Sequence, residues 1–243
     1  MIISVASGKG GTGKTTVATS LAAVLGLRAQ LIDCDVEEPN CHLLMRPVLD
    51  TRRPVSLPVP QVDMSKCNLC EKCGQVCQFS GEVEFVHGLL RVGEAMSPPL
   101  IRAVKSMISP DKAVILDAPP GASCPVINTV IGSDVILMVT EPTPFGLHDL
   151  RIAVDAVKEL GIPLGVVINR SDIGDDGVIK YCQTTQIPIL MQIPHRRAIA
   201  EGYSSGKLLI DAAPEFRDRF LGLYDMLTDL SKGVSGLGGP SHA

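Results

Sequence analysis

Apolar residues gather in short runs that alternate with longer segments of helical period. The short runs are apolar throughout, which is typical of strands covered on both faces of a sheet. In the longer segments, such as 15–26 and 147–161, apolar residues recur every three or four positions, as in amphipathic helices. This alternation predicts an α/β fold with a doubly wound, mostly parallel sheet. The strand-length runs read IISVA, LID, AVILDA, VILMVT, LGVVIN and IPILMQI.

The rhythm breaks between about residues 54 and 93, where prolines and cysteines replace the helix and strand pattern. We therefore expect a small cysteine-rich lobe at 58–92, inserted into an α/β domain formed by 1–57 and 93–231. Near the end of the chain, one apolar stripe predicts a closing helix that packs on the domain. Its members are Phe216, Phe220, Leu223, Tyr224, Leu227 and Leu230. Residues 232–243 are rich in Gly and Ser and are expected to be disordered.

Composition narrows the functional classes. The 243 residues carry 22 basic and 26 acidic side chains without a basic run, so nucleic-acid binding is not expected. The first apolar run is too short for a signal peptide, and residues 231–243 lack the basic amphipathic character of a membrane-binding helix. These features predict a cytoplasmic protein that binds no membrane. In a reducing compartment, clustered members of the eight cysteines are more typical of metal or cluster ligands than of disulfides.

A phosphate-binding motif follows the first strand-length run and opens the first helical segment. It reads Gly8-x4-Gly13-Lys14-Thr15. Glycines let the backbone curl closely around phosphates, and the helix N-terminus adds a positive dipole. We expect Lys14 to reach the β- and γ-phosphates of ATP and the Thr15 hydroxyl to bind Mg²⁺. The expected phosphate-binding residues are Gly8, Lys9, Gly10, Gly11, Thr12, Gly13, Lys14, Thr15 and Thr16.

A second lysine in this loop, Lys9, gives the motif the form GKGGTGKTT. In this respect the chain resembles the MinD/ParA group of deviant Walker P-loop ATPases, over nearly its whole length outside the insert. The resemblance implies that Lys9 reaches across a dimer interface to the partner's nucleotide. A solvated loop lysine is the alternative. ATP binding would then close a homodimer.

Carboxylates at the ends of two later apolar runs fit the same family. The resemblance implies that Asp35, after LID, positions the attacking water, with Asp33 its neighbour at the metal. Asp117, after VILD, would hold Mg²⁺ through water, and residues 119–121 would sense the γ-phosphate. The catalytic residues would be Lys9, Lys14 and Asp35, and the Mg²⁺ residues Thr15, Asp33 and Asp117. The segments matching the family's adenine contacts contribute Asn169, Arg170 and Pro194.

The insert contains four cysteines with the spacing of a bacterial ferredoxin run, which holds a [4Fe-4S] cluster. They are Cys67, Cys70, Cys73 and Cys77. With DVEEPN at 35–40 and DAPPGASCP at 117–125, the chain resembles MinD-superfamily ATPases that carry an inserted ferredoxin domain. It departs from them because a second cysteine run is absent and Gln78 replaces the proline after Cys77. The fourth ligand therefore stays open, and a Zn²⁺ site built from the same thiolates is the alternative.

These observations predict an ATP-binding and ATP-hydrolysing dimeric switch coupled to an iron–sulfur cluster, with a redox or cluster-accepting protein as partner. One alternative is a MinD-type spatial-organising ATPase with a structural zinc lobe, and another is an Mrp-type iron–sulfur scaffold. Cys34, Cys41 and Cys182 are predicted to be small buried apolar residues. The role of Cys124, just past the expected switch, is left open.

Overall fold

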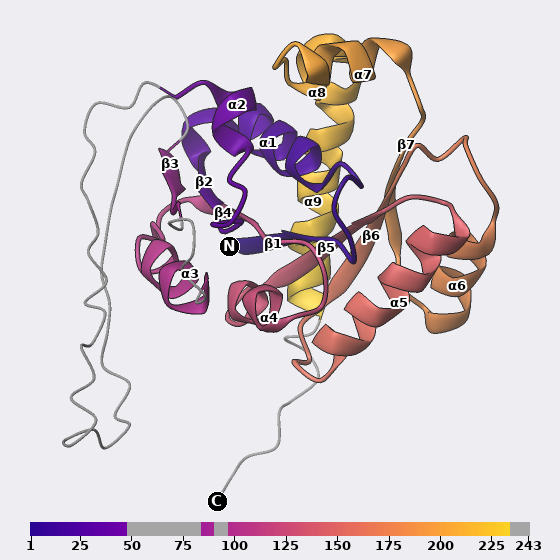
Figure 1. The fold of residues 1–243 in the computed structure, drawn as a ribbon, viewed down its shortest axis with the longest axis horizontal. Coiled ribbons are helices and arrows are strands. Elements are labelled where there is room, and N and C mark those ends of the chain that lie inside the picture. Colours follow the sequence, from indigo (N-terminus) through magenta and orange to yellow (C-terminus); the bar gives the residue numbers. More distant parts are fainter. Residues whose placement is uncertain (48–83, 90–96, 234–243) are drawn as a thin grey trace, which may run out of the picture.

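The computed structural model describes residues 1–47, 84–89 and 97–233. These residues build one sheet of seven parallel strands in the order β3-β2-β4-β1-β5-β6-β7 (Figure 1). The expected α/β class with a parallel sheet is confirmed. The strands are β1 (Ile2–Ala6), β2 (Ala29–Asp33), β3 (Glu84–His87), β4 (Ala113–Asp117), β5 (Val135–Thr140), β6 (Leu164–Asn169) and β7 (Ile189–Ile193).

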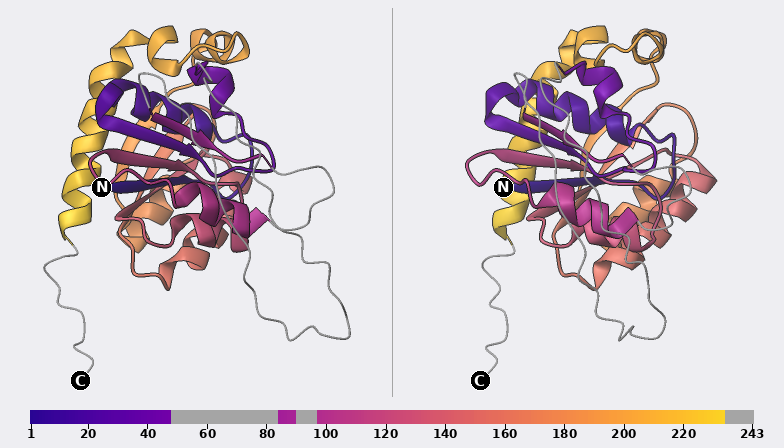
Figure 2. Two further views of the ribbon diagram at one scale, coloured as in Figure 1. Left: turned by 90° about the vertical axis from the view of Figure 1, so that its left-hand side faces the viewer. Right: turned by 60° about the vertical axis from the view of Figure 1, so that its left-hand side comes forward.

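Helices cover both faces of the sheet, with α1 on one side and α3, α4 and α5 on the other (Figures 1 and 2). The α-helices are α1 (Lys14–Leu25), α2 (Cys41–Met45), α3 (Ser97–Lys105), α4 (Cys124–Val130), α5 (Pro144–Lys158), α6 (Gly177–Thr185), α7 (Arg197–Ser204), α8 (Leu209–Ala212) and α9 (Arg217–Gly233). Two 3₁₀ turns span Gly26–Arg28 and Pro214–Phe216. No helix within the described ranges is both long and apolar enough to cross a bilayer.

Alternate residues of each central strand enter opposite cores, because side chains of a strand alternate between its two faces. Ile3 and Val5 of β1 pack with α1 and α9, whereas Ala6 packs with α4, α5 and α6. On the α9 side, Phe216 and Phe220 are almost fully buried. The closing helix and its predicted docking stripe are thus confirmed. A smaller core joins α3 to β2 and β4.

Strand order brings the candidate site residues together at the C-terminal ends of the central strands. β1 lies between β4 and β5, and β4 lies between β1 and β2. In this register Asp117 pairs with Asp33 on one side and with Val5 on the other. Parallel strands have their C-terminal ends on the same side of the sheet, so both carboxylates lie beside the loop that follows β1.

Two details of the sequence reading are wrong. β2 ends at Asp33, so Asp35 lies in the following loop and not at the strand end. Residues 84–87, assigned to the insert, pair with β2 as the edge strand β3. This strand has only four residues, EFVH, and its mixed polarity reflects an edge position with one strand neighbour. The cysteine run at 67–77 and the tail from 234 lie outside the described residues, so the remaining domain limits stay predictions.

Candidate functional site: a nucleotide cavity at the edge of the sheet

The loop between β1 and α1 has a backbone that requires glycine. Gly11 and Gly13 have φ values of 80° and 90°, in the left-handed region that other residues avoid. A Cβ atom on Gly13 would also lie 2.4 Å from the Asn169 Nδ2 atom. No atom lies within 4 Å of a Cβ built on Gly10 or Gly11, so the loop presents bare backbone to open space. Such a loop at a helix N-terminus is suited to an anion such as phosphate.

This loop forms one wall of a cavity of about 420 Å³, a size typical of small-ligand sites. Most residues predicted for nucleotide binding or catalysis line it. They are Lys9, Gly10, Gly11, Thr12, Gly13, Lys14, Thr15, Thr16, Asp35, Asn169, Arg170 and Pro194. Gly8 has a packing role instead, because a Cβ there would lie 2.2 Å from the Asp149 carbonyl oxygen. Glu38, Asn40, His195, Arg196 and Tyr203 also line the cavity and were not predicted from the sequence.

Lys14 lies between two carboxylates behind the loop. Its Nζ atom donates to Asp117 Oδ1 at 2.6 Å and lies 4.0 Å from Asp35 Oδ2. Burial lowers the pKa of Lys14, but the charge of Asp117 and the hydrogen bond to it raise the pKa by more, so the ammonium stays charged. Thr15 Oγ1 donates to the other Asp117 oxygen, Oδ2, at 2.7 Å. The lysine and hydroxyl expected to bind phosphate and Mg²⁺ are therefore held on the Walker-type aspartate.

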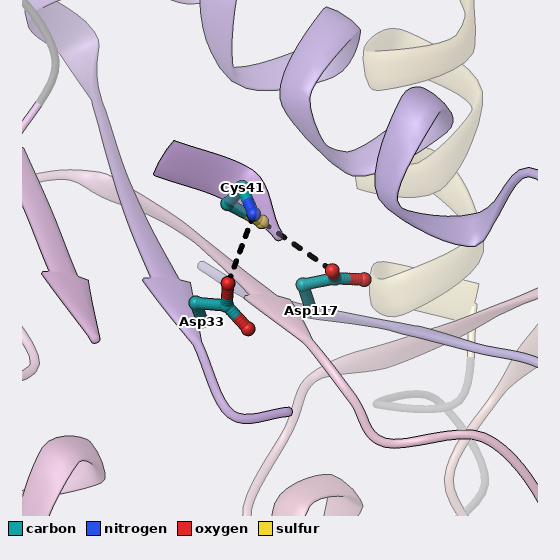
Figure 3. Close-up of side chains that lie close together, drawn as sticks. All are labelled: Asp33, Cys41 and Asp117. Atoms are coloured by element: carbon teal, nitrogen blue, oxygen red, sulfur yellow. Dashed lines mark hydrogen bonds between the residues drawn. The ribbon is translucent and has the colours of Figure 1, made fainter. Parts of the chain in front are cut away.

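Asp33 lies beside Asp117 and accepts backbone N–H groups of the loop that follows it. Asp35 N donates to Asp33 Oδ1 at 3.1 Å, and Cys41 N donates to Asp33 Oδ2 at 3.0 Å. The Cys41 thiol donates to Asp117 Oδ2 at 3.3 Å, so this residue contacts both carboxylates (Figure 3). Burial holds the pKa of Cys41 well above its usual value, so the thiol keeps its proton.

Negative charge exceeds positive charge at this point. Burial, together with the charge of Asp117, raises the pKa of Asp33 to about 7. Burial raises the pKa of Asp35 to about 6, although Lys14 opposes the shift. Burial is the main cause of both shifts, which favour the protonated forms of Asp33 and Asp35. Oxygen atoms of Thr15, Asp33 and Asp117 are the hard donors that Mg²⁺ prefers, so the residues fit this ion. Among the described residues, Asp33, Cys41 and Asp117 place one ligand atom each within 4.8 Å of one another.

The second lysine of the loop has an acidic neighbour within the same chain. Lys9 Nζ lies 4.0 Å from Glu141 Oε2, and the Lys9 side chain is 32% exposed. Glu141 follows β5 and also accepts from Arg170 Nη1 at 2.6 Å. Arg170 directly follows the last residue of β6. Its φ of 52° is unusual for a residue other than glycine. Lys9, Glu141 and Arg170 thus form a charged group at the mouth of the loop.

Both polar atoms of the Asn169 side chain form hydrogen bonds with the protein backbone. Its Nδ2 atom donates to the Thr12 carbonyl at 2.9 Å, and its Oδ1 atom accepts from Arg170 N at 3.0 Å. Each atom retains capacity for one further hydrogen bond. Asn169 therefore holds the phosphate loop in place, and its expected contact with adenine stays a prediction.

The family model CobQ/CobB/MinD/ParA nucleotide binding domain matches residues 3–210, which include the loop, both aspartates and the cavity walls. The chain belongs to this family. An ATP-binding protein of Methanocaldococcus jannaschii is 30% identical to this family member over 203 residues, covering 80% of the chain and 74% of the relative. An iron-sulfur cluster carrier protein of Pyrococcus horikoshii is 26% identical over 270 residues, covering 98% and 88%.

The septum site-determining protein MinD of Pyrococcus horikoshii, solved with Mg-ADP, shares the fold of this MinD/ParA-type chain. The TM-score is 0.69 at 24% identity, with 96% of the chain and 98% of the MinD chain covered. The family match over residues 3–210 confirms the predicted membership of the MinD/ParA group, and the likeness to MinD confirms the fold. The inserted ferredoxin domain stays a prediction.

Besides the unpredicted residues of the cavity wall, the sequence did not point to the roles of Cys41 and Glu141 in this MinD/ParA-type site. Cys41 was interpreted only as a buried apolar residue, and Glu141 was not considered. The signal for Glu141 was its place directly after the VILMVT strand, because strand ends of a parallel sheet converge on the site. No pattern in the chain relates Cys41 to Asp117, 76 positions away. Cys34 and Cys182 are buried as predicted, and Cys124 is exposed at the start of α4.

Proposed function

We propose that this chain binds Mg·ATP in the cavity and hydrolyses it to switch a homodimer, and that the switch serves an iron–sulfur cluster held by the insert. The observation that carries the nucleotide part is the hydrogen bonding of Lys14 and Thr15 to Asp117, directly behind a glycine loop that lines a cavity. In P-loop ATPases the lysine binds the phosphates, and the hydroxyl and the aspartate hold Mg²⁺.

Features of the loop itself support a phosphate ligand. The Thr12 hydroxyl is buried and has no hydrogen-bond partner. A buried hydroxyl without a partner is costly, so a ligand that accepts from it is favoured. Gly10 and Gly11 line the cavity, and no atom lies within 4 Å of a Cβ built on either residue, so their backbone is open to a ligand. The ATP-binding relative, 30% identical, supports ATP as the nucleotide.

Each cavity residue then has a role that follows from its position. Lys14 leaves Asp117 for the β- and γ-phosphates, because the polyphosphate offers more negative charge than one carboxylate. Thr15, Asp33 and Asp117 would hold Mg²⁺, which would supply positive charge beside the phosphates. Asp35, 4.0 Å from Lys14, lies at the cavity surface, where it orients the attacking water. Lys9, at the exposed mouth, contacts the nucleotide of a second copy.

The iron–sulfur part rests on the cysteine spacing and on one relative. Cys67, Cys70, Cys73 and Cys77 lie outside the described residues, so the proposal takes their role from the sequence. The Pyrococcus horikoshii relative covers 98% of this chain and is named an iron-sulfur cluster carrier protein. This favours a cluster that passes to an acceptor protein over a permanent redox centre.

Metal and sulfide analysis of anaerobically purified protein tests the cluster. We expect iron and acid-labile sulfide in comparable amounts, with broad absorption that dithionite bleaches. The Cys70→Ser variant should lose both, whereas Cys182→Ser, which alters a buried thiol of α6, should keep them. Stoichiometric zinc without sulfide in protein never exposed to air would replace the cluster by a zinc site. A [4Fe-4S] centre that moves to an apo-acceptor protein would support the carrier role.

A further inference from the structure

Cys41 is the first residue of α2 and ends the loop 34–40, which carries Asp35. The residue is fully buried. Its backbone N–H donates to Asp33 Oδ2 at 3.0 Å, and its thiol donates to Asp117 Oδ2 at 3.3 Å. These acceptors belong to two different strands, β2 and β4, whose ends lie in register. One residue therefore connects both carboxylates of the expected Mg²⁺ site to the start of α2 (Figure 3).

The other donors to Asp117 have a second task. Lys14 donates to Oδ1 and Thr15 to Oδ2. Both are needed by Mg·ATP, since the lysine binds phosphates and the hydroxyl binds the metal. Cys41 is fully buried and does not line the cavity, unlike Lys14 and Thr15. Among the described residues, Lys14, Thr15 and Cys41 donate side-chain hydrogen bonds to Asp117, and of these Cys41 is the one that the nucleotide and its metal leave available.

We propose that Cys41 is a positioning residue for Mg²⁺, and that its thiol and backbone N–H hold Asp117 and Asp33 in the orientation that receives the ion. This inference rests on the proposed Mg·ATP site. A carboxylate that rotates freely would present its lone pairs to the metal only part of the time. Hydrogen bonds from surrounding groups to metal-binding side chains restrict this motion, and their loss typically lowers metal affinity about 10- to 100-fold.

The same contact connects the metal site to the catalytic loop. Asp35 N donates to Asp33 Oδ1, and Cys41 N donates to Asp33 Oδ2, so Asp33 holds both ends of the loop. The thiol then attaches the far end of the loop to Asp117. A shift of Asp117 upon metal binding would therefore be felt by Asp35 through Cys41. Loss of the thiol should weaken Mg²⁺ binding and misplace Asp35, while the phosphate loop keeps its shape.

The test measures binding of a fluorescent ATP analogue to the full chain, first in EDTA and then across a Mg²⁺ titration. Cys41→Ala removes the thiol donor but keeps the backbone N–H. We expect unchanged affinity in EDTA and about a tenfold rise in the Mg²⁺ concentration at half effect. Cys41→Ser restores a hydroxyl donor and should recover most of the loss. Cys182→Ala, which removes a buried thiol from α6, is the matched control and should behave as the parent.

Several results would overturn the positioning role. These are parent-like Mg²⁺ dependence in Cys41→Ala, an equal loss of affinity with and without Mg²⁺, or failure of the serine variant to recover. If the alanine variant does not fold, the Cys41→Ser variant provides the test. A folded serine variant that needs ten times or more the Mg²⁺ concentration of the parent would contradict the role of a hydrogen-bond donor at this position. Failure of the parent itself to bind the analogue would instead reject the proposed nucleotide site.

Discussion

At the scale of single residues, the buried carboxylates of the site outnumber the lysine that lies among them. Asp33 and Asp117 are fully buried, Asp35 lies close by, and Lys14 is the lysine placed among them. A site that favours an added cation is less stable without it. Function and folding stability thus oppose each other at these residues, as is common at active sites.

Stability of the nucleotide-free protein should therefore depend on pH. The folded-state pKa values of Asp33, about 7, and Asp35, about 6, lie above the ordinary value of 3.8. The folded state binds more protons than the unfolded state between these values, so the free energy of unfolding falls as pH rises from about 4 to 7. Thermal unfolding should show a lower midpoint at pH 7.5 than at pH 5.

Mg²⁺ that binds with ATP would place a cation beside these carboxylates and favour their ionised forms, which should suppress this dependence. The Asp33→Asn variant, which cannot ionise at this position, should also have a flatter profile than the parent. A nucleotide-free parent whose unfolding midpoint rises steadily between pH 5 and pH 7.5 would contradict the charge imbalance at the site.

At the scale of helices and strands, Lys105 makes several hydrogen bonds between α3 and α4, beside the one from Arg102 to the Asn128 side chain. Lys105, the last residue of α3, donates through Nζ to the carbonyls of Asn128, Thr129 and Ile131 at 2.9, 2.6 and 2.6 Å. These carbonyls form the C-terminal end of α4, where a helix has free acceptors and a partial negative charge. The contact thus connects α3 with α4, the helix that follows loop 119–123. Within this loop, Gly121 N donates to Ser7 O.

Replacing Lys105 by methionine should destabilise this contact. Methionine keeps the apolar stem but leaves the carbonyls without their charged donor, at a cost of about 2 kcal/mol in the free energy of unfolding. Urea unfolding monitored by circular dichroism gives the change. Lys158→Met, at the exposed end of α5, is the control and should shift the midpoint little. Equal midpoints for the two variants would mean that solvent satisfies the α4 carbonyls.

At the scale of the whole molecule, the expected event is ATP-dependent association of two chains. The cavity mouth holds Lys9, one-third exposed, near Glu141 of the same chain. Asp35 lines the cavity, and its Oδ2 atom lies 4.0 Å from Lys14 Nζ. In the proposed function Asp35 orients the attacking water within its own chain and Lys9 contacts the nucleotide of the second chain, so their loss should have different consequences for assembly.

Asp35→Ala should bind ATP, close and accumulate as a dimer, because only the positioning of water is lost. Lys9→Ala should bind ATP and stay largely monomeric. Hydrolysis should fall by about 10³ or more in both variants. Light scattering with and without ATP measures the oligomeric state, and Lys158→Ala serves as the control. If Lys9→Ala dimerises as readily as the parent, Lys9 is a solvated loop lysine.

Local patterns in the sequence determined much of this protein. The glycine loop, Lys14 and the carboxylates at 33 and 117 are marked by neighbours within a few residues, because phosphate binding and strand ends are local features. Six strands were recognisable because burial on both faces makes them continuously apolar. The edge strand Glu84–His87 was missed, since a four-residue run of mixed polarity carries no such signal.

Tertiary structure alone decided which distant residues share the site. Strand order brings Asp33 beside Asp117, and only then does the position of α2 place the Cys41 thiol on Asp117. Likewise, β6 and its Asn169 reach the Thr12 carbonyl across 157 positions of sequence. A hydrogen bond between such residues depends on packing of the whole sheet and leaves no periodic trace in the chain. The sequence alone therefore identifies the expected ligands of phosphate and metal, whereas packing determines the groups that hold those ligands in place.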